Sequence, residues 1–146
     1  MKRRAGIIGA ALTGLALSAH AYTSAYTSLA VPGTHNGWST TPSMTLQADY
    51  VWVGTQTFAS AGGAFKFAAN GSWTVNWGGN HSILHVPARD VGGLAQGGSD
   101  VSYTNLATGS YRFTFYESTA TFDLVPLALP APAATNVQVV GSFNGD

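Results

Sequence analysis

The sequence predicts an all-β sandwich, and three observations support this prediction. After residue 21 no segment shows helical periodicity, whereas short runs of β-branched and aromatic residues alternate with turn residues. Residues 111–115 (Tyr-Arg-Phe-Thr-Phe) alternate aromatic and polar side chains, as a half-buried strand does. Residues 65–79 contain two aromatic-rich runs around an Asn-Gly pair, which tolerates the positive φ of a hairpin turn.

The first 21 residues predict a signal peptide rather than part of the fold. Residues 2–4 are cationic, residues 5–17 are apolar, and Ala19-His20-Ala21 has the small-x-small pattern of a cleavage site. The apolar run is too short to span a bilayer. We therefore expect an exported protein, periplasmic, cell-surface or extracellular, with a mature chain that begins near Tyr22.

The mature chain is expected to form one module over residues 22–125. Seven strands are predicted in it, at 29–31, 50–58, 64–69, 73–77, 101–105, 110–116 and 121–125. The Gly-rich stretch between Gly78 and Ser99 is expected to be a long loop with room for a short edge strand.

The character of the sequence changes after the module. Residues 126–136 contain three prolines and no charge, which predicts a semi-extended linker. The motif at 31–37 (Val-Pro-Gly-Thr-His-Asn-Gly) then recurs at 139–145 as Val-Val-Gly-Ser-Phe-Asn-Gly. We expect residues 137–146 to begin a second, truncated module of a longer tandem protein.

Composition excludes several classes of function. The mature part of the 146-residue chain carries three cations and six acids, a formal charge of −3, whereas nucleic-acid and anionic-membrane binding need clustered Lys and Arg. The absence of cysteine excludes disulfides, thiolate metal sites and a cysteine nucleophile. His81 and His85 are spaced i, i+4, but in a Gly-rich loop with no third ligand beyond Asp90, so no metal site is predicted. No cofactor is expected.

The hairpin at 65–79 suggests the ligand. Phe65 and Phe67 are expected to share one face with Lys66 on the other, and Trp73 and Trp77 are expected to share a face with the valine between them. Lys66 is the only lysine of the mature chain. A single cation beside flat aromatic rings suits a neutral, hydroxyl-rich ligand with apolar C–H faces. A sugar has these properties.

The chain resembles the early-set, immunoglobulin-like starch- and glycogen-binding modules. The residues that carry the resemblance are Gly33-Thr34-His35-Asn36-Gly37-Trp38, Phe65-Lys66-Phe67, Asn70-Gly71-Ser72-Trp73, and a late Asn105 before a Gly-Ser-Tyr strand. It is similar to carbohydrate-binding modules of family forty-eight, including the glycogen-binding module of AMP-activated kinase. It is also similar to modules of bacterial outer-membrane starch-utilisation proteins and of secreted amylases and pullulanases.

This resemblance implies an immunoglobulin-like antiparallel β-sandwich and a set of site residues. Trp38 and Trp73 match the two platform tryptophans of the kinase module, Lys66 its ligand-facing lysine and Asn105 its hydrogen-bonding asparagine. Trp77, with Asn76, matches the Asn-Trp-Gly of the starch-utilisation modules and would extend the platform. The implied function is non-catalytic binding of α-glucan (starch, glycogen or maltooligosaccharide), which would hold a longer secreted protein on its polysaccharide.

The sequence also allows other roles for these residues. Tryptophans in a small sandwich are often core residues, Lys66 could guard a strand edge, and Asn105 could cap a turn. If every tryptophan is buried, the chain is an immunoglobulin-like spacer or adhesion domain without a sugar site. The chain itself is not expected to be an enzyme, because glycoside hydrolysis needs two opposed carboxylates and no motif pairs its acids. A catalytic domain in cis remains an alternative for the parent protein.

Overall fold

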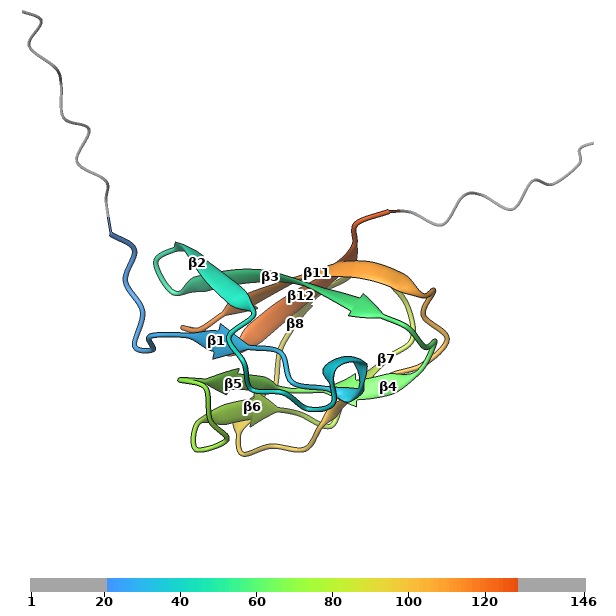
Figure 1. The fold of residues 1–146 in the computed structure, drawn as a ribbon, viewed down its shortest axis with the longest axis horizontal. Coiled ribbons are helices and arrows are strands. Elements are labelled where there is room, and N and C mark those ends of the chain that lie inside the picture. The colour runs from blue at the N-terminus through green and yellow to red at the C-terminus, as the bar shows by residue number, and fades with distance from the viewer. Residues whose placement is uncertain (1–20, 129–146) are drawn as a thin grey trace, which may run out of the picture.

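The computed structural model describes residues 21–128, which form two packed layers of mostly antiparallel strands (Figure 1). The predicted signal peptide, most of the predicted linker and the start of the second module lie outside the described residues. The elements are β1 (Leu29–Ala30), the 3-10 turn η1 (Thr34–Asn36), β2 (Met44–Ala48), β3 (Val51–Phe58), β4 (Gly63–Phe65), β5 (Phe67–Ala69), β6 (Asn76–Gly78), β7 (Ser82–Ile83), β8 (Ala88–Val91), β9 (Ala95–Gln96), β10 (Val101–Tyr103), β11 (Gly109–Tyr116) and β12 (Thr121–Pro126).

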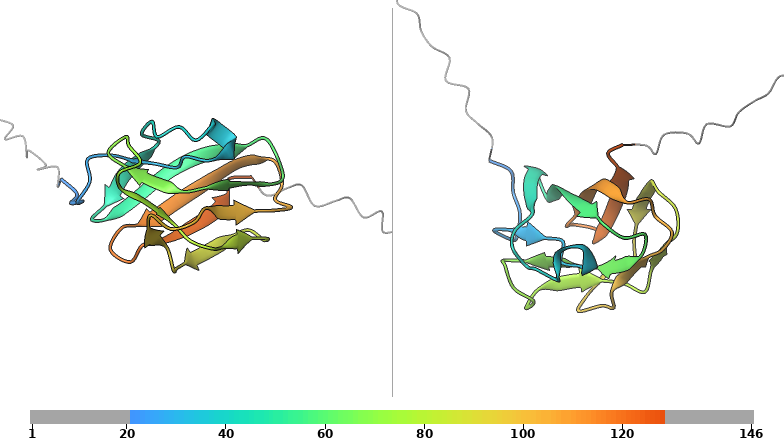
Figure 2. Two further views of the ribbon diagram at one scale, coloured as in Figure 1. Left: turned by 90° about the horizontal axis from the view of Figure 1, so that it is seen from below. Right: turned by 45° about the vertical axis from the view of Figure 1, so that its right-hand side comes forward.

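The strands form a nine-stranded sheet, in the order β8-β12-β11-β3-β2-β1-β5-β6-β9, and a three-stranded sheet, in the order β4-β10-β7. Apart from the parallel pair β10–β7, all neighbours are antiparallel. The long strands β3, β11 and β12 lie in one layer, and β5 and β6 lie in the other (Figures 1 and 2). The predicted all-β, immunoglobulin-like sandwich is confirmed.

An aromatic core fills the space between the layers. On β11 the residues Tyr111, Phe113 and Phe115 are buried while Arg112 between them is exposed, so the predicted alternation holds. Phe113 lies at the centre, with its ring centroid 5.0 Å from that of Phe65. The fully buried phenylalanines are Phe58, Phe65, Phe67, Phe113, Phe115 and Phe122.

The insertion at 78–99 is more ordered than predicted. It supplies β7, β8 and β9, of which β8 and β9 form the two edges of the nine-stranded sheet. Only residues 92–94 separate these strands in sequence, so the insertion links both edges of the curled sheet, and Leu94 is buried in the core. Both outermost strands are thereby short and joined to each other, which limits the exposed edge length on which other chains could pair.

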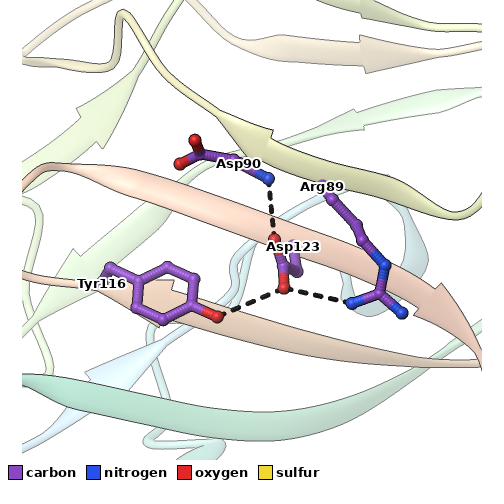
Figure 3. A network of polar contacts seen from close by, with 4 residues as sticks. All are labelled: Arg89, Asp90, Tyr116 and Asp123. Carbon is purple, nitrogen blue, oxygen red and sulfur yellow. Dashed lines mark hydrogen bonds and ion pairs between the residues drawn. The ribbon is translucent and has the colours of Figure 1, made fainter.

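Asp123 on β12 holds the insertion against the sheet (Figure 3). Its carboxylate accepts hydrogen bonds from the Asp90 backbone N–H at 2.7 Å and from the Tyr116 hydroxyl at 3.2 Å, and it pairs with Arg89 at 3.5 Å. Burial, with the charge of Asp123 second, raises the pKa of Tyr116. The phenol therefore stays protonated and able to donate at neutral pH.

Within residues 21–128 there is no helix with the length and apolar character needed to span a bilayer. The same part of the chain holds no group of three His, Cys, Asp or Glu side chains able to bind a metal ion.

Gly78 allows the insertion to pack against β6, and this predicts a specific sensitivity. A Cβ at Gly78 would collide with the Ser99 carbonyl oxygen and come within 3.0 Å of Lys66 Cε. We expect Gly78→Ala to lower the free energy of unfolding by about 1–3 kcal/mol, as overpacked sites do. Chemical denaturation measures the loss.

Gly92 provides the matched control, because a Cβ there would meet nothing closer than Thr121 Cγ2 at 3.7 Å, an ordinary contact. Gly92→Ala should therefore leave stability nearly unchanged. If both variants had the same free energy of unfolding, the insertion would be able to shift away from Gly78 and would not pack as described.

Candidate functional site

The Asn70-Gly71 turn presents Trp73 to solvent. Both turn residues are left-handed, with φ of 56° and 67°, and the Ser72 N–H donates to the Ala69 carbonyl at 3.3 Å. This is the predicted turn with positive φ at both central positions. Trp73 follows it before β6 begins and is 43 % exposed. The Asn76 side chain donates to the Trp73 carbonyl at 2.7 Å, which fixes the backbone that carries the indole.

A second turn presents Trp38. The Trp38 N–H donates to the Gly33 carbonyl at 2.9 Å. The Asn36 side chain accepts a hydrogen bond from the Gly33 N–H and donates one to the Val31 carbonyl, each at 2.9 Å. Gly37 and Trp38 both have left-handed φ, 64° and 63°. For a bulky residue such as Trp38 this conformation is strained, by about 1–2 kcal/mol. Strain of this kind concentrates at binding sites, where the surrounding structure holds it in place.

The two turns meet at the surface. The indole centroids of Trp38 and Trp73 lie 6.2 Å apart, with 44° between the ring planes. The Thr40 hydroxyl donates to the Gly71 carbonyl at 3.0 Å and so ties the segment after Trp38 to the hairpin. We call Trp38 and Trp73 the tryptophan pair. It is an angled, partly exposed aromatic surface built on two hydrogen-bonded turns.

Lys66 lies between β4 and β5, with the buried Phe65 and Phe67 on either side of it in sequence, as predicted. Its ammonium donates to the Gly98 carbonyl at 2.5 Å. The insertion therefore provides a partner for Lys66 that the sequence did not reveal. An ammonium has three donors, and this contact uses one of them.

Trp77 is a correction to the predicted site. It is 8 % exposed and packs in the core, with its ring 5.1 Å from Tyr26 and 5.3 Å from Phe115. A sugar ring cannot stack on a face that is already covered. The prediction that Trp73 and Trp77 share one face failed because the strand begins only at Asn76, so alternation does not extend back to Trp73.

Asn105 is the second correction. It is exposed, with φ of 59°, in the loop after β10, near Ala61, whose carbonyl accepts from the Leu106 N–H at 3.1 Å. The extended run from residue 63 to residue 69 separates that end of the sandwich from the Asn70-Gly71 turn, a span of about 20 Å. Asn105 therefore does not lie beside the tryptophan pair. It lines a separate pocket of about 510 Å³ together with Leu84 and Tyr111.

Thr40 and Asn76 contribute to the site in ways that the sequence did not predict. Thr40 joins the two turns, and Asn76 fixes the Trp73 carbonyl. Thr40 lies in a Ser/Thr/Pro stretch with nothing to mark it. Asn76 stood next to a tryptophan that was expected to provide the contact, and its neighbour Trp77 proved to be a core residue.

No protein-family model matches the chain, and no curated protein matches its sequence. The fold is similar to a solved structure described as the ligand-induced structure of AmyP-SBD, a starch-binding domain. The TM-score is 0.53 and the sequence identity 14 %, with 86 % of this chain and 95 % of that chain covered. At this identity the likeness concerns the fold. The chain thus shares its overall fold with that domain.

Proposed function

We propose that the chain is a non-catalytic module that binds α-glucan through the tryptophan pair. The observation that carries the proposal is the partly exposed, angled contact of Trp38 and Trp73, held by two turns with left-handed residues. The apolar face of a glucose ring stacks on indole, and each such contact contributes on the order of 1 kcal/mol beyond area burial. The fold shared with a starch-binding domain supports this ligand class.

The angle between the rings favours a curved glycan. Two indoles inclined by 44° face successive sugars that turn relative to each other, as they do along an α-1,4-linked chain. A flat β-linked ribbon would instead suit coplanar rings. We therefore place starch, glycogen and maltooligosaccharides ahead of cellulose-like or chitin-like polymers.

Hydrogen bonds would add orientation to the stacking. Within the described part of the chain the Lys66 ammonium has the Gly98 carbonyl as its hydrogen-bond partner, and we propose that its other two donors reach sugar hydroxyls. With two rings and few hydrogen bonds the affinity should be weak, on the order of micromolar to millimolar. Repetition of such a module would raise the effective concentration of sites, which suits a longer exported protein carrying further modules or a catalytic domain.

The spacer alternative requires all four tryptophans to be buried. Trp52 and Trp77 are core residues, but Trp73 is 43 % exposed and contacts Trp38. This observation favours a binding surface. Export, which the signal peptide predicts, remains a prediction.

Affinity electrophoresis tests the proposed function. Soluble starch in the gel should retard the protein more than a β-glucan does, and Trp73→Ala should remove the retardation because one ring of the pair is lost. Maltoheptaose should also quench or shift the tryptophan fluorescence of the native protein and not that of the variant. The control is Tyr50→Ala, which removes a similarly exposed aromatic ring (40 %) at the β2–β3 turn. Unretarded native protein, or retention by Trp73→Ala equal to native, would refute the proposal.

A further inference from the structure

We propose that His35 is a positioning residue for Trp38: its neutral imidazole keeps the turn at 33–38 closed, and protonation opens the turn and separates the tryptophan pair. If the tryptophan pair separates, the protein should release polysaccharide at acidic pH, and this consequence rests on the proposed function. The closing of the turn by neutral His35 and its opening on protonation concern the fold alone.

The imidazole of His35 is packed inside the turn that carries Trp38. Its ring lies 5.3 Å from that of Phe58, and a Cβ on Gly33 would come within 2.8 Å of His35 Nδ1, so the ring fits only because residue 33 is glycine. Gly33 is also the residue whose carbonyl accepts the Trp38 N–H. Displacement of the imidazole would therefore disturb the bond that sets the position of Trp38.

Both nitrogens of this ring are buried, and neither has a hydrogen-bond partner among the described residues. The Gln56 side chain and the Val31 carbonyl face the ring and favour its charged form, but less than burial disfavours it. A neutral imidazole tolerates this environment at a modest cost. A charged imidazolium is more costly to bury, and Gln56 and Val31 offset that cost only in part.

Within residues 21–128, no carboxylate is placed to offset a positive charge on His35. The elements that pack against η1 are β3 and β4, and neither carries a titratable side chain. The nearest charged residue beyond β4 in sequence is Lys66, which is itself a cation bonded to Gly98. Behind Phe58 lies Tyr103, whose ring stacks on Phe58 at 4.2 Å and whose buried hydroxyl has no partner in the described structure.

The direction of the pH effect follows from burial. Burial lowers the pKa of His35 below its ordinary value of 6.5, and Gln56 and Val31 oppose this shift only in part. A group whose pKa is lowered in the closed turn binds protons more tightly when the turn is open. The closed turn is therefore fully favoured above 6.5 and loses its advantage as the pH falls below that value.

Circular dichroism can follow the turn without any ligand. Two indoles 6.2 Å apart should give an exciton couplet, which Trp38→Ala identifies by removing it. We expect the couplet to weaken in the native protein as the pH falls from about 6.5 towards 5. It should persist at the acidic end in His35→Gln, which cannot titrate, and should weaken as in the native protein in the control His85→Gln, which changes an exposed histidine of the insertion.

The inference would be overturned if the couplet of the native protein did not change with pH. It would also be overturned if the couplet of His35→Gln weakened at acidic pH as it does in the native protein. If His35→Gln does not fold, NMR titration of His35 in the native protein decides. Titration below 6.5 supports the inference, and titration at or above 6.5 overturns it.

Starch affinity measured over the same range separates this inference from the proposed function. We expect the dissociation constant to rise by at most about one log unit per pH unit, the limit for a single linked proton. A couplet controlled by His35 in a protein that binds no polysaccharide at any pH would refute the function and leave the role of His35 intact. Starch affinity and a couplet that are both constant with pH would refute the role of His35 and leave the function intact.

Discussion

Trp38→Gly is expected to weaken starch binding by about tenfold to a hundredfold while producing a protein more stable than the matching Trp38→Ala variant. Both substitutions remove one ring of the tryptophan pair, so both lose the stacking contact. They differ at the backbone, where residue 38 has a φ of 63°. Glycine adopts this conformation without the cost of about 1–2 kcal/mol that other residues incur.

Comparison of the two variants separates the effect of backbone strain at residue 38 on stability from the effect of the lost indole ring on binding. Affinity electrophoresis in soluble starch measures binding, and urea denaturation measures the free energy of unfolding. We expect similar weak binding for both and a stability difference of about 1 kcal/mol in favour of glycine. Native-like retention by either variant would remove Trp38 from the site. An alanine variant as stable as the glycine variant would mean that the turn relaxes and that the strain is not held by the fold.

Local sequence patterns predicted most of the architecture and the exposure of Trp73. The alternation on β11 and the Asn70-Gly71 turn depend on neighbouring residues only, and both were recovered. The exposure of Trp73 follows from its place just after that turn. Trp77 was misplaced because the loop after Gly71 is longer than the pattern suggested, which ended the alternation early.

Contacts between distant segments were beyond the reach of such patterns. β2 was not predicted, since its five residues lie in a Ser/Thr/Pro context, and the predicted strand at 64–69 is interrupted at Lys66, where the chain passes from one sheet to the other. The partner of Lys66 is a glycine carbonyl 32 positions away. β8 and β9 are too short to recognise by composition, yet each has a partner strand supplied by the rest of the fold.

The same distinction explains why Asn105 was assigned to the wrong end of the molecule. Its order along the chain agreed with the family resemblance, but the structure positions it through the loop that follows β10. The φ of 59° at Asn105 fits the alternative that it serves a turn. Pocket residues such as Leu84, His85 and Tyr111 surround it, rather than the tryptophan pair.

Phe113→Ala is expected to have the largest effect on stability, because Phe113 is fully buried where the two layers meet. Its ring faces those of Phe65 at 5.0 Å, Phe58 at 6.0 Å and Phe67 at 6.2 Å. Truncation removes the transfer free energy of the ring and leaves a cavity among side chains that β-sheet hydrogen bonds hold in place. We expect a loss of about 3–5 kcal/mol, a large part of the total stability of a domain this size.

Arg112→Ala is the matched control, since Arg112 is the preceding residue on β11 and its side chain is exposed on the opposite face. It should change the free energy of unfolding by no more than about 0.5 kcal/mol. Urea denaturation followed by tryptophan fluorescence measures both variants, and Phe113→Leu should fall between them because it leaves a smaller void. A loss below about 1 kcal/mol for Phe113→Ala would mean that the layers close over the missing ring. The sandwich would then be too plastic to hold two turns, and the tryptophan pair between them, in a fixed geometry.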